Sequence, residues 1–97
     1  MARGYKSSGE KTSDTAIVAV AAQLGGILII TDGTNDATVI LYDNATAASG
    51  TKLWEAKVPG SDEYGGCMFP EPVEAMNGIY ADLTGTGASC IVYYRER

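Results

Sequence analysis

From Thr15 onward, the chain alternates between short apolar runs and clusters of glycine, asparagine and aspartate. The runs are rich in β-branched and aromatic residues, which pack well on the pleated surface of a sheet. Short runs separated by turn residues at intervals of roughly 8 to 12 positions are typical of sandwiches and small barrels. The sequence therefore predicts an all-β fold, a small antiparallel β-sandwich or barrel of about seven strands, at 15–21, 24–31, 37–43, 51–58, 66–70, 78–84 and 88–94.

Alternation within these runs also predicts the core, because successive side chains of a strand point to opposite faces of the sheet. In the run 78–84, the apolar side chains share one face, and Tyr80, Asp82 and Thr84 share the other. The residues expected to face the core are Ile79, Ala81, Leu83, Cys90, Val92, Tyr94, Val39, Leu41, Leu28 and Ile30. The last two runs then form a hairpin that closes a sheet.

Residues 1–14 have a different character, being polar, mixed in charge and without periodicity. We therefore expect a flexible N-terminal arm over 1–14, followed by a single β domain over 15–97. The arm carries Arg3, Tyr5, Lys6 and Lys11, which are candidates for contact with an acidic protein surface.

The charge balance limits the classes of partner. The 97 residues contain 12 acids and seven bases, a net charge of −5, so we expect no nucleic-acid partner, because phosphate would be repelled. The longest apolar run, 16–30, is interrupted by Gln23, Gly25 and Gly26 and is shorter than the ~20 apolar residues of a spanning helix. We expect no membrane partner and a protein that stays in the compartment where it is made.

The chain has no histidine, which is the commonest general base and the commonest metal ligand. Carboxylates occur in predicted loops at Asp62, Glu63, Glu71 and Glu74, but nothing in the sequence brings two of them together as a glycosidase pair. We therefore predict that the chain is not an enzyme and has no catalytic residues and no cofactor.

Two patterns bear on metal binding. Asp32, Asn35 and Asp36 lie in one glycine-containing turn, but their spacing departs from that of a calcium loop, and such residues also serve turns without an ion. Cys67 and Cys90 lack the paired spacing of a zinc site. We expect them to be buried free thiols, with a disulfide between adjacent strands as the alternative. The sequence predicts no metal site.

Aromatic side chains gather in the predicted strands at Trp54, Tyr42, Tyr80, Tyr93 and Tyr94. Together they could form a stacking platform for sugar rings, but on alternating strands such residues more often half-cover a sheet or anchor a protein interface. Trp54 and Tyr80 are therefore candidate partner-binding residues. A carbohydrate-binding module for host glycans stays open as an alternative function.

Four segments carry a resemblance to known proteins: TDGTNDATV, a YDN loop followed by SGTK, FPEPV, and the ending NGIYADLTGTGASCIVYY. They resemble small accessory structural proteins of tailed bacteriophages. The resemblance covers residues 28–94 and leaves the arm unmatched. Proteins of this kind serve as capsid decoration, head-fibre or tail components.

The resemblance implies a virion structural protein, in the first place a capsid decoration or cement protein that binds the major capsid protein and stabilises the shell. Such a protein is expected to be a homo-oligomer, with a trimer favoured, because a threefold or local threefold axis of the shell would hold it. It would lie on the capsid surface after assembly in the host cytoplasm. The alternative within the virion is a tail or head-tail neck component.

Overall fold

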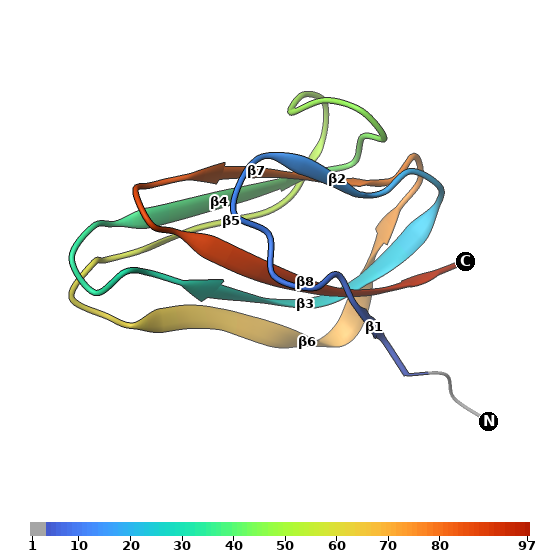
Figure 1. Cartoon of the computed structure of the whole chain (residues 1–97). Helices are drawn as coiled ribbons and strands as arrows, with labels where there is room; N and C mark the ends of the chain where they lie inside the picture. Colours follow the sequence, from blue (N-terminus) through green and yellow to red (C-terminus); the bar gives the residue numbers. More distant parts are fainter. Residues whose placement is uncertain (1–3) are drawn as a thin grey trace.

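The computed structural model describes residues 4–97, which form eight strands and no helix (Figure 1). The strands are β1 (Lys6–Ser7), β2 (Thr15–Val18), β3 (Ala22–Ile30), β4 (Ala37–Tyr42), β5 (Lys52–Val58), β6 (Tyr64–Ala75), β7 (Ile79–Thr84) and β8 (Ser89–Glu96). They pair antiparallel in two four-stranded sheets, sheet A in the order β1-β8-β3-β6 and sheet B in the order β2-β7-β4-β5. The predicted all-β sandwich is confirmed. In this part of the chain, no helix is long and apolar enough to cross a membrane.

The core lies between the two sheets. Its largest fully buried side chains are Leu24, Ile29, Leu41, Ile79, Val39, Val92 and Cys90. Burial of each large aliphatic side chain stabilises the fold by about 1.5–3 kcal/mol. The core positions predicted on β4, β7 and β8 are confirmed, with Leu83 and Tyr94 only partly buried at its margin.

Strand β3 contains a bulge at Gly25. Its register with both neighbours shifts between Leu24 and Gly26, and on β6 the residues 69–72 fall between the partners of these two positions. An extra residue in one strand moves every later side chain to the opposite face of the sheet.

The bulge corrects the predicted core of β3. Ile27 and Ile29 are buried, whereas Leu28 and Ile30 are half-buried and lie on the outer face of sheet A. The expectation that Leu28 and Ile30 face the core is therefore wrong. Strict alternation from the buried Leu24 would place Leu28 and Ile30 on the core side. The extra residue in the bulge moves them to the outer side.

Strand β6 is longer than predicted and includes Pro70 and Pro72. Proline cannot donate a backbone hydrogen bond, so it is tolerated at the edge of a sheet and at bulges. Both conditions hold here, because β6 is the outermost strand of sheet A and the prolines lie opposite the irregular part of β3.

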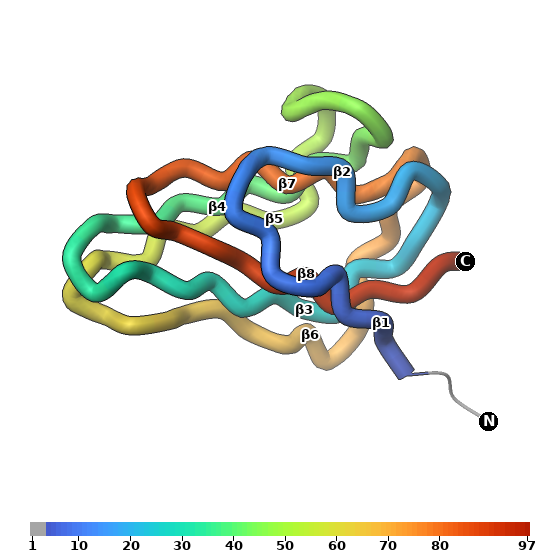
Figure 2. The backbone as a smooth tube through the Cα atoms, in the orientation of Figure 1, coloured from blue at the N-terminus to red at the C-terminus, as the bar shows by residue number. Residues whose placement is uncertain are grey.

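The segment from Lys6 to Asp14 lies against both sheets. Strand β1 pairs Lys6 with Tyr94, and the Ser8 amide donates to the Val92 carbonyl at 2.8 Å. Figure 2 shows the chain passing from the edge of sheet A across to sheet B before β2 begins.

Two further contacts complete this crossing. Lys11 and Cys90 exchange backbone hydrogen bonds of 2.8 and 2.9 Å, and the Asp14 carboxylate accepts from the Leu83 amide at 2.8 Å. The segment 6–14 is therefore hydrogen-bonded to both sheets, and β1 adds an eighth strand to the predicted seven. Residues 1–3, with the candidate Arg3, lie outside the described residues.

Candidate functional site

An apolar surface covers the outer face of sheet A, the side turned away from sheet B. Because the bulge at Gly25 turns Leu28 and Ile30 outward, they lie in cross-strand rows with residues of β6 and β8. We call this surface the sheet A face; its large side chains are Leu28, Ile30, Tyr64, Met68, Ile91 and Tyr93.

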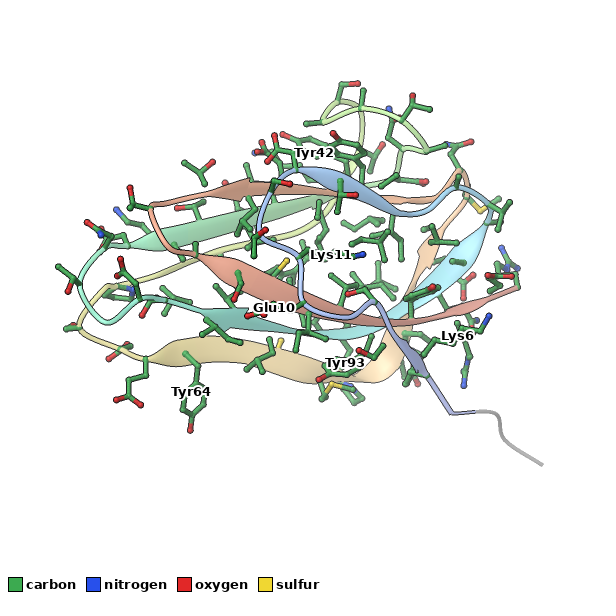
Figure 3. The ribbon with its side chains drawn as sticks, in the orientation of Figure 1. Lys6, Glu10, Lys11, Tyr42, Tyr64 and Tyr93 are labelled. Carbon is green, nitrogen blue, oxygen red and sulfur yellow. The ribbon has the colours of Figure 1, made fainter. Side chains whose placement is uncertain are left out.

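The two large residues contributed by β6 are the most exposed part of the sheet A face. Tyr64 is 68% and Met68 57% exposed. In Figure 3, Tyr64 lies at the lower surface beneath β6, whereas Tyr42 lies at the upper surface beside sheet B. Contiguous exposed apolar surface of this kind marks interaction sites.

A shallow apolar groove of about 380 Å³ runs along this face beside β6. The residues that line it include Leu28, Tyr64, Gly66, Met68 and Tyr93. Gly66 has a φ of 134°, and a side chain there would collide with the Ile27 carbonyl, so the position requires glycine. The groove is therefore built into the backbone of the sheet.

Tyr5, one of the predicted contact residues, lies on the sheet itself. Its ring packs over Gly25, where a Cβ would approach the ring carbons to 2.5 Å. The Arg95 guanidinium lies over the same ring, 4.8 Å from its centroid. Tyr5 therefore anchors the N-terminal segment to the bulge.

Lys6 lies on β1 at the edge of sheet A, and Lys11 lies further along the crossing segment, where it pairs with Cys90 (Figure 3). The Lys6 ammonium lies 3.5 Å from the Glu96 carboxylate, and both side chains are largely exposed. Exposed pairs of this kind contribute ~0–1 kcal/mol, so the Lys6 ammonium stays accessible to a partner, whereas Lys11 is half-buried.

Trp54 and Tyr80 lie on opposite faces of sheet B. Trp54 pairs in register with the buried Leu41 and packs against the core, while Tyr80 pairs with Tyr42 on the outer face. A sugar-stacking platform needs exposed rings side by side, and these two rings do not form one. The predicted contact residues are thus divided between the two sheets.

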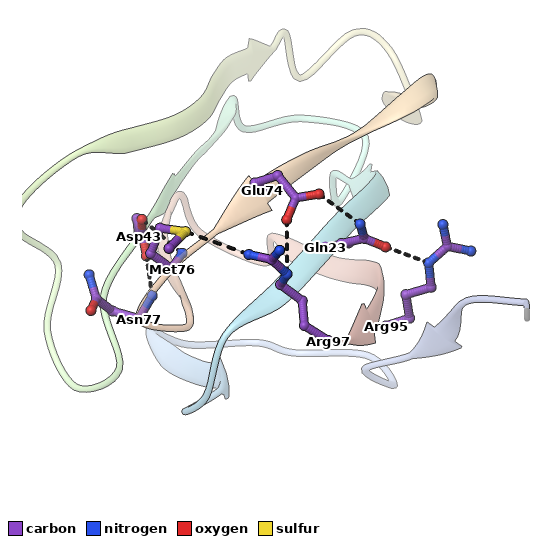
Figure 4. A network of polar contacts seen from close by, with 7 residues as sticks. All are labelled: Gln23, Asp43, Glu74, Met76, Asn77, Arg95 and Arg97. Carbon is purple, nitrogen blue, oxygen red and sulfur yellow. Dashed lines mark hydrogen bonds and ion pairs between the residues drawn. The ribbon is translucent and has the colours of Figure 1, made fainter.

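Polar side chains link the ends of three strands next to the sheet A face (Figure 4). The Glu74 carboxylate accepts from Gln23 at 2.7 Å and pairs with Arg97 at 3.2 Å, while Gln23 accepts from Arg95 at 2.7 Å. This network fixes Arg95 where it covers Tyr5.

The acidic turn at 32–36 is held by its own hydrogen bonds. The Asn35 amide donates to Asp32 at 2.7 Å and is the main cause of the lowered pKa of Asp32. The Gly60 amide donates to Asp36 at 2.8 Å and, with Lys57, lowers the pKa of Asp36. Within residues 4–97, no three His, Cys, Asp or Glu side chains are grouped as metal ligands.

One carboxylate on sheet B is held in an unfavourable environment. Partial burial raises the pKa of Asp82, and the negative charge of Asp14 beside it raises that pKa further. Because the Asp14 side chain also accepts from the Leu83 amide, the two acids stay together.

The two cysteines differ in environment. Cys90 is fully buried, and burial raises the pKa of its thiol to about 11. Cys67 is exposed, so the prediction that both thiols are buried is wrong for Cys67, which lies on an edge strand. Both are free, and strand β3 separates their strands.

Comparison of the chain with protein-family models, with curated proteins and with solved structures finds no match.

The sheet A face was not among the predicted contact residues. The signal that could have indicated it is the pair of glycines in LGGILII, because glycine inside a strand often marks a bulge. With a bulge placed there, Leu28 and Ile30 would have been assigned to the outer surface.

Proposed function

We propose that this chain is a structural protein of a bacteriophage virion, a capsid decoration protein that binds the major capsid protein through the sheet A face. The observation that carries the proposal is the apolar side chains on the outer side of an otherwise complete sandwich. The sequence resemblance supplies the identity of the partner.

The energetics of the sheet A face suit a docking role. Tyr64 and Met68 each leave more than half of their surface exposed in the isolated domain. Apolar area removed from water on binding contributes about 25 cal/mol per Å², and aromatic side chains and methionine are enriched at interface cores.

The charge distribution adds a second element. Lys6 and Lys11 lie along the β8 edge of sheet A, at the opposite edge from β6, in a chain with net charge −5. They pair with Tyr94 and Cys90, so they lie toward the inner side of that edge and outside the sheet A face. A capsid surface that is apolar where it meets Leu28 and Met68 and acidic where it meets the two lysines would complement this arrangement.

In this proposal, the protein acts on the capsid surface as a homo-oligomer, with a trimer at a threefold position. A tail or head-tail neck position would use the same face against a different virion protein. Sedimentation of the purified protein measures the oligomeric state.

The test is binding to purified shells that lack the native copy. We expect wild-type protein to bind stoichiometrically and Tyr64→Ala to bind at least about tenfold more weakly, as for an interface anchor. Tyr42→Ala, on sheet B, is the matched control and should bind as wild type does. Failure of wild type to bind shells, or equal binding by both variants, would overturn the proposal.

A further inference from the structure

The four edges of the two sheets differ in how they are protected. A sheet edge presents unpaired backbone groups, and proteins protect it by short strands, bulges, prolines or charges. Strand β1 has two residues, β2 has four and a register shift, and β5 carries two lysines and a glutamate. Three of the four edges are therefore protected along their whole length.

The fourth edge, β6, is protected over half of its length. Its second half contains Pro70 and Pro72 and is irregular. Its first half, the segment 64–69, contains neither proline nor charge, and residues 64–68 of it pair in regular register with β3 on one side (Figure 1). We call this segment the open edge.

The open edge and the groove lie together. Tyr64, Gly66 and Met68 belong to both, so a strand added beside β6 would place its alternate side chains next to the apolar groove. Recognition by strand addition works in this way: backbone hydrogen bonds supply affinity, and pockets for alternate side chains supply specificity.

Acidic residues flank the open edge on both sides. Asp62 and Glu63 precede it, and Glu71 follows it. None of these three carboxylates belongs to an ion pair of the part of the chain that the structure describes. An uncharged centre between acidic ends is complementary to a strand with an apolar centre and basic ends.

The same charges oppose pairing with a second copy. An antiparallel pairing of two β6 strands about Cys67 places Glu63 of each copy opposite Glu71 of the other. If the register between the two strands shifts by one residue, Asp62 takes the place of Glu63 opposite Glu71. Like charges directly opposite destabilise a strand pair.

We propose that the open edge binds an extended segment of another protein, apolar at alternate positions and flanked by Lys or Arg, which adds to sheet A as a fifth strand. The proposal rests on the binding role proposed above and assigns its contact segment. It does not require that the partner be a capsid protein.

The test uses the purified full chain and a labelled probe peptide, KRVTVTVRK, followed by fluorescence anisotropy. We expect this peptide to bind and its acidic counterpart, EEVTVTVEE, not to bind. Binding should weaken as salt is raised, because the flanking charges are exposed and screened. A peptide with proline in place of the central valine should also fail, because it lacks a backbone donor.

Matched variants locate the site. Met68→Lys puts a charge at the groove and should weaken binding of the basic peptide at least about tenfold, because the lysine would be desolvated beside apolar groups. Val20→Lys is the control, because Val20 is 54% exposed against 57% for Met68 and lies outside the groove. Near-UV circular dichroism checks that both variants fold.

Each alternative outcome overturns the inference. It falls if the basic peptide does not bind, or if Met68→Lys and Val20→Lys bind it equally. It also falls if the wild-type chain forms dimers that Met68→Lys dissociates, because the occupant is then a second copy. The peptide experiment contains no shells, so its result is independent of the capsid proposal. If the protein binds the basic peptide but not the shells, this inference stands and the capsid role is rejected. If it binds the shells but not the peptide, the capsid role stands and this inference is rejected.

Discussion

The ring of Tyr5 lies over Gly25, and this contact joins the N-terminal segment to the bulge of β3. Glycine has no Cβ, so the ring can occupy the space that any other side chain would fill. The Arg95 guanidinium also lies over the ring, 4.8 Å from its centroid, and such a cation–π contact at an exposed site contributes about 0.5–1 kcal/mol. A polar segment without a core of its own is held in this way.

Gly25→Ala should destabilise the protein by about 1–3 kcal/mol, because the new Cβ overlaps the Tyr5 ring and the ring must move. Urea unfolding measures the loss, and hydrogen exchange at the Ser8 and Lys11 amides should show that β1 detaches first. Gly4→Ala is the control, because a Cβ there meets no atom within 4 Å. If Gly25→Ala costs the same in a Tyr5→Ala background, the contact does not anchor the segment.

The two thiols should react at very different rates in the native protein. We expect iodoacetamide at neutral pH to modify the exposed Cys67 and to reach the buried Cys90 only after unfolding. Mass spectrometry of peptides from native and denatured samples counts the labels. Equal labelling of both sites in the native protein would contradict the structure.

The raised pKa of Cys90 also predicts a pH dependence of stability. Between the ordinary value of 9.0 and about 11, the folded protein keeps the thiol proton while the unfolded chain releases it. The free energy of unfolding should therefore fall as pH rises through this window. Cys90→Ala should reduce this loss of unfolding free energy with pH. If the variant loses as much as wild type does, other groups cause the pH dependence.

Asp82→Asn should stabilise the protein at pH 7. The folded-state pKa of Asp82 is raised, so the folded state loses stability as pH rises through that pKa and the carboxylate becomes charged beside Asp14. The gain should be roughly 0.5 kcal/mol after allowance for solvent screening. It should vanish at pH 3, where wild-type Asp82 is protonated. A loss of stability at pH 7 would show that the carboxylate is stabilising.

Asp43→Ala should cost about 1–3 kcal/mol, because two backbone amides lose their acceptor. The Asp43 carboxylate accepts from Met76 at 3.0 Å and from Asn77 at 2.7 Å, which holds the turn between β6 and β7 (Figure 4). Urea unfolding measures the difference. Asp43→Asn keeps one acceptor oxygen and should fall between alanine and wild type; an alanine variant as stable as wild type would mean that water replaces both bonds.

The sequence predicted most of the strands because alternation is regular on β4, β7 and β8. Val39, Leu41 and Val92, for example, are buried as the period of two requires. Leu28 and Ile30 were assigned to the wrong face because the bulge at Gly25 interrupts the alternation before them. A bulge arises from the pairing of β3 with β6 and β8, which the alternation of side chains along one strand does not reveal.

The attachment of Lys6 and Lys11 could not be predicted for a different reason. Their contacts to β8 are backbone hydrogen bonds, which leave no pattern in the side chains. Trp54 was assigned to a contact surface from its residue type, whereas its register with Leu41 turns it toward the core.

A single position in β3 thus decides which aliphatic side chains face the core and which face outward. Loss of one residue between Leu24 and Ile27 would exchange the two sets, sending Leu28 and Ile30 inward and Ile27 and Ile29 outward. Both sets are aliphatic and similar in volume, so the sandwich would keep an aliphatic core after such a deletion. A change in length at this position would therefore be expected to change the outer surface of sheet A while the fold is kept.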